Sequence, residues 1–111
     1  MRGPPYAMAD YVLTEQARQD FRDIYRYSLK RWGEAQADKY TSGLLDQFDM
    51  LATFPGMGLP FYKPSYGLLK FPYEYHMIAY RIFDEATIQV VFVIHGQIFI
   101  PEEIARRVDR D

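Results

Sequence analysis

Cysteine is absent from this chain, and its absence excludes three kinds of site. Without thiols there is no disulfide framework, no thiolate nucleophile and no thiolate metal site. This composition suits a reducing compartment, and we expect a cytoplasmic protein. Histidine is scarce as well: His76 and His95 each lack a carboxylate or a second histidine at ligand spacing. We therefore expect no metal and, with no Gly-rich phosphate loop, no other cofactor.

Long apolar runs and a basic excess are also missing. The longest apolar run is far shorter than a membrane span, and no charged-then-apolar leader opens the chain. We expect a soluble, unexported protein without a membrane partner. The formal net charge is −2, whereas a protein that grips a phosphate backbone normally carries a basic excess. Direct binding of nucleic acid by the chain alone is therefore not expected.

Aromatic side chains are abundant, at 17% of 111 residues, and ten of them are tyrosines. Tyrosine joins an apolar ring to a polar tip, which predicts many half-buried or partner-facing positions. The length and the 49% hydrophobic content predict one globular domain over residues 8–111. Residues 1–7 carry two prolines and no periodicity, so we expect a disordered extension there.

Two apolar runs, Tyr75–Phe83 and Thr87–Ile94, predict a β-hairpin at the centre of a sheet, with the short polar spacer Asp84–Ala86 between them. Side chains alternate across a strand, so the first run has two distinct faces. One face is expected to carry His76, Ile78, Tyr80 and Ile82, and the other Met77, Ala79, Arg81 and Phe83. The second run is apolar on both faces, which indicates a strand covered on one side by helices and on the other by a groove or partner.

Apolar residues at helical spacing predict two helices before this hairpin. The first is expected to begin after a Thr14 cap and to end at Trp32-Gly33, and the second to begin at Glu34 and to stop before Pro55. The expected core-facing residues are Ala17, Phe21, Ile24 and Ser28 in the first helix and Ala37, Tyr40, Leu44, Phe48 and Leu51 in the second. The tight link between them predicts an antiparallel helical hairpin.

The remaining segments complete an α+β fold. Tyr11–Leu13 reads as a short strand, Pro55–Pro64 as a loop, and Gly67–Phe71 as a strand that Pro72 breaks. Pro101–Arg107 predicts a short terminal helix, with proline first, acids in the first turn and arginines in the last. The order is therefore strand, helix, helix, three strands, with the helical hairpin packed on a small, mainly antiparallel sheet.

Five short motifs follow one another in a fixed order along the chain. They are Thr14, Ala17, Asp20 and Ile24-Tyr25; Trp32-Gly33, Ala37 and Tyr40; Leu51-Ala52, Pro55 and Gly58; His76, Ile78, Tyr80 and Arg81; and Ile94-His95. This ordered set, from Tyr11 to His95, resembles the RelE/ParE superfamily of bacterial toxin–antitoxin toxins, and within it the ParE branch.

The resemblance to the ParE branch implies a toxin that binds DNA gyrase and traps its DNA-cleaved state, without catalysis of its own. It also implies a cognate antitoxin that lays an extended or helical segment over the toxin's apolar surface, and hence a hetero-oligomer. The charge balance and the Tyr-rich sheet agree, because both suit protein partners.

The candidate partner-binding residues are Tyr62, Tyr66, Tyr80, Arg81 and His95. Together with Tyr73 and Tyr75, these tyrosines predict a protein-binding groove, although the same rings could stack bases. A simpler interpretation of Arg81 pairs it with an acid on the sheet face. His76 is expected to be a hydrogen-bonded core or rim residue.

A different class of function remains open. The RelE branch comprises ribosome-dependent messenger RNA endonucleases, whose reaction needs a base, an acid and cations around the scissile phosphate. The residues that could supply these groups here are Lys63, Lys70, Arg81 and His95, with Glu74 or a tyrosine in support.

A third hypothesis is an inactive relative that only binds an antitoxin. Family members usually follow the final histidine with an Arg-Met-Asp-like tail, whereas here the chain continues as Gly96-Gln97-Ile98-Phe99. Members also often carry arginines in the loop where Tyr62-Lys63 and Tyr66 stand here. Both regions are places where the family's activity usually lies.

Overall fold

The computed structural model describes residues 10–96 and 105–108. Its helices and strands are β1 (Asp10–Leu13), α1 (Glu15–Trp32), α2 (Glu34–Thr53), β2 (Leu59–Pro60), β3 (Leu69–Tyr73), β4 (His76–Asp84) and β5 (Thr87–His95). Two 3₁₀ turns, η2 (Pro55–Met57) and η3 (Pro64–Tyr66), interrupt the loops, and residues 105–108 are helical. The predicted extension at 1–7 and most of the predicted terminal helix lie outside the described residues.

The two helices begin and end where the sequence predicts. The Thr14 hydroxyl accepts a hydrogen bond from the Ala17 N–H at 3.0 Å, which caps α1. Gly33 links the helices with φ 90°, a backbone angle that other residues rarely adopt. All but one of the predicted core-facing residues are buried, and Phe21 is half-buried against the same core. The antiparallel helical hairpin is thereby confirmed.

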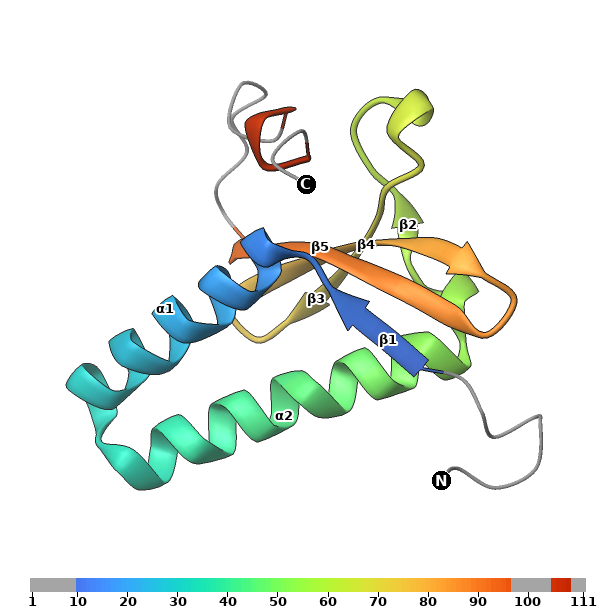
Figure 1. The fold of residues 1–111 in the computed structure, drawn as a ribbon. Helices are drawn as coiled ribbons and strands as arrows, with labels where there is room; N and C mark the ends of the chain where they lie inside the picture. Colours follow the sequence, from blue (N-terminus) through green and yellow to red (C-terminus); the bar gives the residue numbers. More distant parts are fainter. Residues whose placement is uncertain (1–9, 97–104, 109–111) are drawn as a thin grey trace.

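The five strands form one mixed sheet in the order β1-β5-β4-β3-β2. Three of the four pairings are antiparallel, and only β1 runs parallel to its neighbour β5. Figure 1 shows both helices on one side of the sheet, and the 61–68 loop and the turn at 105–108 on the other. The α+β class and the mainly antiparallel sheet are thus confirmed.

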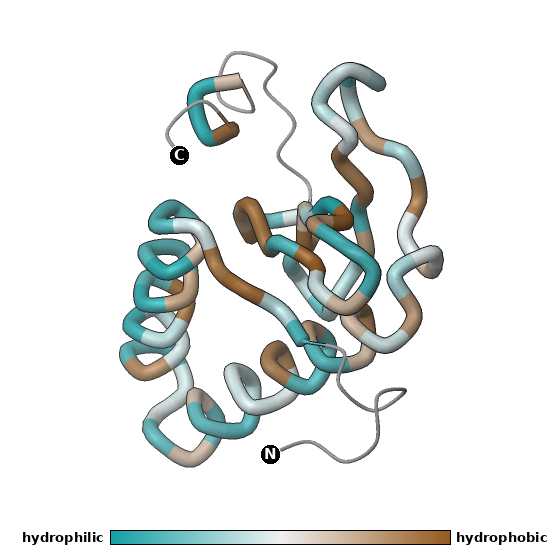
Figure 2. The backbone as a smooth tube through the Cα atoms, turned by 45° about the vertical axis from the view of Figure 1, so that its right-hand side comes forward, coloured by the Kyte–Doolittle hydropathy of each residue, from teal (hydrophilic) through white to brown (hydrophobic). Residues whose placement is uncertain are grey.

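Each face of the sheet has its own apolar cluster. Helices α1 and α2 pack on one face against Ile78, Tyr80, Ile88, Val90 and Val93. On the opposite face Phe61, Leu68 and Val108 pack against Ala79, Val91, Phe92 and Ile94. In Figure 2 the hydrophobic segments accordingly concentrate in the strands, while the outer sides of both helices are hydrophilic.

A β-bulge lets β5 serve both clusters. Ala79 pairs with Phe92 and Tyr80 with Val90, so Val91 has no residue opposite it. This extra residue shifts the alternation, and Val91 and Phe92 both join the cluster on the face away from the helices. The predicted alternation in β4 holds through Tyr80, because its partner carries the irregularity.

Two details of the predicted sheet are wrong. Pro72 does not end β3, since it pairs with Met77 of β4. β2 pairs only with Leu69 and Lys70, which leaves the outer side of β3 around Pro72 without a strand neighbour among the described residues. Proline is tolerated at such an edge because no ladder hydrogen bond from its nitrogen is needed. The other error is β2 itself, which forms within the segment predicted to be a loop.

A buried carboxylate joins three parts of the chain that are remote in sequence. Asp20 of α1 accepts hydrogen bonds from the Val93 N–H at 2.9 Å and from Gln16 at 2.8 Å. Arg107, in the short helical turn at 105–108, contacts both carboxylate oxygens at 2.8 Å. Its guanidinium also lies 5.9 Å from the Phe92 ring centroid. Asp20 therefore fastens α1, β5 and the C-terminal turn together.

We predict that Asp20→Ala lowers the free energy of unfolding by about 3–5 kcal/mol, because it leaves a largely buried guanidinium and a buried N–H without their acceptor. Urea denaturation followed by circular dichroism measures the change. Asp23→Ala is the matched control, since Asp23 is an exposed carboxylate of the same helix that also holds an arginine. Equal losses in the two variants would contradict the assignment.

Candidate partner-binding site

The predicted tyrosine groove is divided between the two faces of the sheet. Tyr62 and Tyr66 pack with the cluster away from the helices. Tyr73 packs on the helix side, where its hydroxyl donates to the Tyr40 carbonyl at 2.8 Å. Tyr75 is 63% exposed at the turn between β3 and β4. One continuous aromatic groove is therefore not formed.

Tyr80, which the sequence places among the candidate partner contacts, is a core residue in the structure. The side chain is fully buried. Its hydroxyl donates to the Pro55 carbonyl at 2.6 Å and accepts from the Gly58 N–H at 2.8 Å. A Cβ at Gly58 would clash with that hydroxyl oxygen, so glycine is needed for this close approach. Tyr80 thus fixes the loop that follows α2.

Arg81 has an amide and a carbonyl as partners, where an acid was the predicted one. Its Nε donates to Gln89 Oε1 at 2.8 Å, and Nη1 donates to the Tyr66 carbonyl at 3.4 Å. The Tyr62 and Tyr66 rings pack 5.4 Å apart, and Lys63 Nζ lies 5.7 Å from the Tyr62 centroid. These side chains form a half-buried polar and aromatic surface at the loop 61–68.

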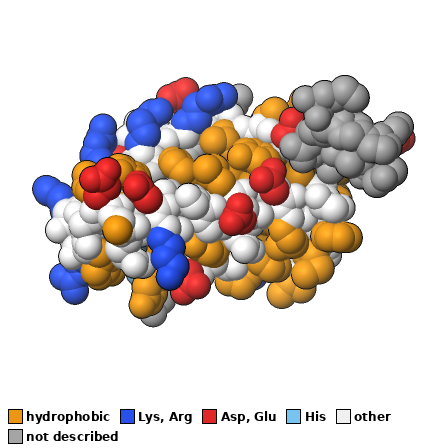
Figure 3. Space-filling model, turned by 90° about the horizontal axis from the view of Figure 1, so that it is seen from below, with side chains coloured by type: hydrophobic (Ala, Val, Ile, Leu, Met, Phe, Trp, Pro, Cys, Tyr) orange, Lys and Arg blue, Asp and Glu red, His pale blue; other side chains and the backbone are white. Residues whose placement is uncertain are grey.

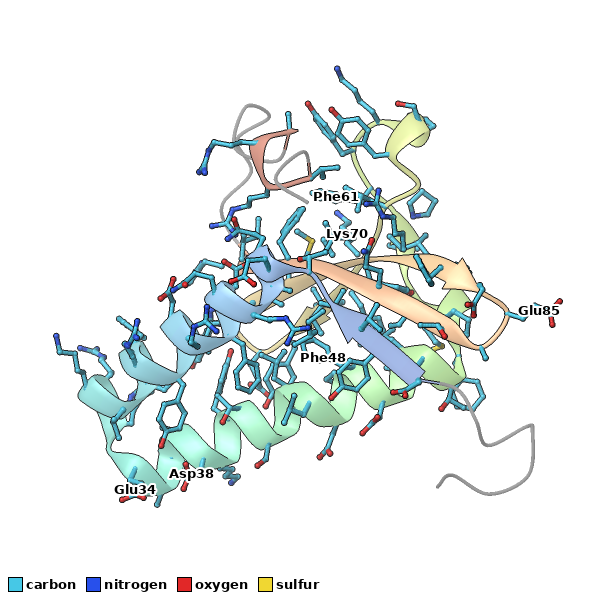
Figure 4. The ribbon with its side chains drawn as sticks, in the orientation of Figure 1. Glu34, Asp38, Phe48, Phe61, Lys70 and Glu85 are labelled. Carbon is cyan, nitrogen blue, oxygen red and sulfur yellow. The ribbon has the colours of Figure 1, made fainter. Side chains whose placement is uncertain are left out.

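An apolar hollow, which we call the β3 hollow, lies beside the open edge of β3 and has a volume of about 730 Å³. It is lined by Met57, Leu59, Lys70, Phe71, Pro72, Glu74, Tyr75, His76, Met77, His95 and Gly96. Met57 and Leu59 are 54% and 64% exposed, although both are large and apolar. Lys70 Nζ lies 5.5 Å from the Phe61 ring centroid, and Figure 4 shows both side chains on the side of the sheet away from the helices.

Sequence reasoning did not single out Met57 and Leu59. Both stand in the Pro- and Gly-rich segment predicted to be a loop, and no periodicity marks them. The available signal was the presence of two large apolar residues in the stretch Pro55–Pro60, whose other residues are all Pro or Gly. Exposed apolar residues that gather around a cavity mark a binding surface more reliably than single ones do.

His76 is the hydrogen-bonded rim histidine that the sequence predicts. Its Nδ1 lies 2.7 Å from the Tyr40 hydroxyl, and the two histidine rings, His76 and His95, are 5.8 Å apart. Burial lowers the pKa of His76 from its usual value of 6.5, and the neighbouring His95 adds to this lowering. Burial also raises the pKa of Tyr40 to about 12. Both groups are therefore neutral at pH 7.

The β3 hollow collects only two of the four residues proposed for nuclease chemistry. Lys70 and His95 line the β3 hollow, whereas Lys63 and Arg81 do not. General acid–base cleavage needs its groups within hydrogen-bond reach of one scissile bond. Within residues 10–96 and 105–108, no three Asp, Glu or His side chains gather in a way that could hold a metal ion.

Solved toxin–antitoxin structures have the same arrangement of a helical hairpin on a mixed sheet. One is a chromosomal ParDE system from P. aeruginosa, with a TM-score of 0.68 and 21% identity over 79% of this chain and 96% of that one. Another is the RelBE2 toxin–antitoxin complex from Mycobacterium tuberculosis, with a TM-score of 0.59 and 19% identity over 78% and 96% of the two chains. At these identities the comparison shows a shared fold.

Sequence comparisons identify the family to which the chain belongs. A family model described as the ParE toxin of the type II toxin–antitoxin system parDE matches residues 11–98. Toxin ParE1 of Caulobacter vibrioides is 33% identical over 79% of this chain and 90% of its own length. Toxin ParE of Escherichia coli is 28% identical over 91% and 98% of the two chains. This chain belongs to the ParE family of type II toxin–antitoxin toxins.

Tyr80→Phe is expected to lower the free energy of unfolding by about 1–3 kcal/mol, because the Pro55 carbonyl and the Gly58 N–H lose their shared partner. Denaturant titration measures the change. Tyr25→Phe is the matched control: its hydroxyl donates to Asp38 at the surface, and its loss should change stability by less than about 0.5 kcal/mol. A Tyr80→Phe protein as stable as the control would refute the role given to Tyr80.

The lowered pKa of His76 predicts a stability that depends on pH. The unfolded imidazole, with a pKa of about 6.5, binds a proton more readily than the folded one does. The free energy of unfolding should therefore be highest above that value and fall as the pH is lowered from about 6.5 toward the folded pKa. Urea midpoints between pH 8 and pH 5 test this. His76→Gln should flatten this part of the profile, and an unchanged slope would count against His76 as its source.

Proposed function

We propose that this chain inhibits DNA gyrase by direct binding, traps its DNA-cleaved state and is neutralised by a cognate antitoxin. Membership of the ParE family supports the gyrase target. Support for binding over catalysis comes from the separation of the candidate nuclease residues, of which only Lys70 and His95 line the β3 hollow. No enzymatic activity is included in the proposal.

We assign the β3 hollow to the antitoxin. Along Phe71–Tyr73 the strand β3 pairs with β4 on one side only, within the described residues. An edge strand of this kind can accept an added strand through backbone hydrogen bonds, while adjacent pockets receive its side chains. The exposed Met57 and Leu59 supply apolar area at this place. An extended antitoxin segment that carries apolar side chains fits the hollow.

Tyr62, Tyr66, Arg81 and His95 remain proposed partner contacts. Tyr62, Tyr66 and Arg81 belong to one surface, at the loop 61–68, and each is half-buried. His95 is exposed at the end of β5 and lines the β3 hollow. Aromatic and arginine side chains of this kind are enriched where protein interfaces hold most of their binding energy. We assign the loop surface to gyrase and His95 to the antitoxin side.

The gyrase proposal predicts that the purified chain, freed of antitoxin, blocks supercoiling of relaxed plasmid by gyrase and accumulates cleaved DNA. Addition of the antitoxin should restore supercoiling. Gel electrophoresis of the plasmid, with and without protease treatment to reveal cleaved complexes, gives both readouts. Supercoiling that proceeds normally at a large molar excess of the chain would refute the proposal.

Leu59→Glu separates the two partners. A charge in the apolar hollow should weaken neutralisation by the antitoxin at least tenfold, measured as the antitoxin needed for half-restoration, while inhibition of gyrase persists. Leu29→Glu, at an exposed leucine of α1, is the matched control and should leave neutralisation unchanged. Equal effects of the two changes would argue against the assignment of the hollow.

A further inference from the structure

A second hollow lies between the end of α1, α2 and the β3–β4 turn, with a volume of about 600 Å³. We call it the aromatic hollow. It is lined by Asp23, Ile24, Tyr27, Ser28, Arg31, Trp32, Tyr40, Tyr75, His76 and His95. Tyr27, Trp32 and Tyr75 are 60%, 46% and 63% exposed. Three large rings around one cavity of this size can hold a planar ligand of the bulk of a nucleotide.

Contacts on two separate elements position the Tyr27 and Trp32 rings and the backbone of Tyr75. Tyr27 and Trp32 pack edge to face with their centroids 5.9 Å apart. Opposite them, the Tyr75 N–H donates to the Tyr40 hydroxyl at 3.3 Å, and the Tyr75 carbonyl accepts from the Gly96 N–H at 2.8 Å. Glu74, just before Tyr75, has φ 50°, a strained backbone angle for this residue type. The turn thus presents Tyr75 at the cost of local strain.

Polar side chains also line this hollow. The neutral His76 and the nearby His95 lie 5.8 Å apart, ring to ring, and Ser28 contributes a hydroxyl. Imidazole nitrogens and hydroxyls can each donate or accept a hydrogen bond. The hollow therefore combines ring faces for stacking with groups that can contact the polar edge of a base.

A row of cations leads along α1 to this hollow. Arg18, Arg22, Arg26 and Lys30 follow one another at four-residue spacing, and all four are exposed. Such spacing places successive side chains along one side of a helix. Arg31 continues this charge into the lining of the hollow. Two of the arginines also contact exposed acids at 3.5–3.6 Å, pairs that are weak in water.

The net charge of −2 conceals this row, because the fold separates the charges. Helix α1 has five basic and three acidic residues, whereas α2 has one basic and four acidic residues. Figure 3, seen from the α2 side, shows acidic side chains over that face and most basic ones along its upper and left edges. Figure 4 shows Glu34 and Asp38 at the start of α2. The surface of α1 is locally basic.

We propose that the aromatic hollow and the basic row of α1 bind single-stranded nucleic acid. One base stacks among Tyr27, Trp32 and Tyr75, and the backbone phosphates follow the cations along α1. Stacking rings beside a basic track are the combination by which proteins bind unpaired strands. An acidic protein segment would match the cations, whereas a nucleic acid matches the cations with its phosphates and the three exposed rings with a base, so we favour the nucleic acid. The proposal does not depend on gyrase as the target.

Trp32 makes the test direct, because it is the only tryptophan of the chain and lies in the hollow. We expect a twelve-residue oligothymidylate to quench its fluorescence on titration into the purified full-length protein. Affinity should fall as salt rises, with a slope of about −0.7 per phosphate contacted. A polyglutamate peptide of equal length should cause no quenching.

Variants with matched controls locate the binding. Tyr27→Leu should weaken binding about tenfold because it removes a stacking face. Tyr27→Phe keeps the ring and should bind with the affinity of the wild type. Phe83→Ala removes an exposed ring at the other end of the sheet and should have no effect. Lys30→Gln should reduce the salt slope by about one phosphate contact, whereas Lys39→Gln on α2 should not.

Three outcomes would overturn the proposal. One is unchanged Trp32 fluorescence at low salt in the presence of excess oligonucleotide. Another is equal quenching by the polyglutamate peptide, which would identify the site as one for acidic protein segments. The third is wild-type affinity in both Tyr27→Leu and Lys30→Gln. None of these results bears on gyrase inhibition, which is measured separately by plasmid supercoiling.

Discussion

Both faces of β5 must be removed from water, and the rest of the fold is arranged to achieve this. Ile88, Val90 and Val93 face the helices, while Val91, Phe92 and Ile94 face the opposite side, where Phe61, Leu68 and Val108 cover them. Burial of large aliphatic and aromatic side chains contributes about 1.5–3 kcal/mol each, so a strand left bare on one side would cost much of the stability. Asp20 then fixes the parts on both sides through Val93 and Arg107.

The same arrangement leaves the opposite edge of the sheet incomplete. β5 and β4 are flanked on both sides, but β3 extends beyond the two residues of β2, and apolar side chains gather beside its open edge. This is the edge that we assign to the antitoxin, because an open strand can accept an added one. The buried Tyr80 hydroxyl contributes here indirectly, since it fixes the loop between α2 and β2 that presents Met57 and Leu59.

Charged side chains, like exposed apolar ones, are distributed unevenly over the surface of the protein. The exposed side of α1 is basic and that of α2 is acidic, even though the two helices are consecutive and packed together. The aromatic hollow lies at the basic side and the β3 hollow beside the sheet edge, and His76 and His95 line both. Tyr75 lines both hollows as well, so two surfaces of different chemistry meet at these three residues.

The sequence by itself determined the helices, the strands β1, β4 and β5, the first part of β3, the class of fold and the family. Those depend on local patterns: a Thr14 cap, apolar residues at helical spacing, alternation in β4, and motifs in a fixed order. Tertiary structure alone decided which side chains are free to act. Tyr80 is of a residue type that is common at interfaces, but the fold buries it. Arg81 pairs with Gln89 because the β4–β5 register places the two residues opposite each other. Met57 and Leu59 form part of an apolar surface only because segments remote in sequence pack together. The same packing places the α1 cations beside three aromatic rings. Local sequence patterns determine the backbone conformation. The exposure of a side chain and the charges around it depend on which segments of the folded chain pack beside it.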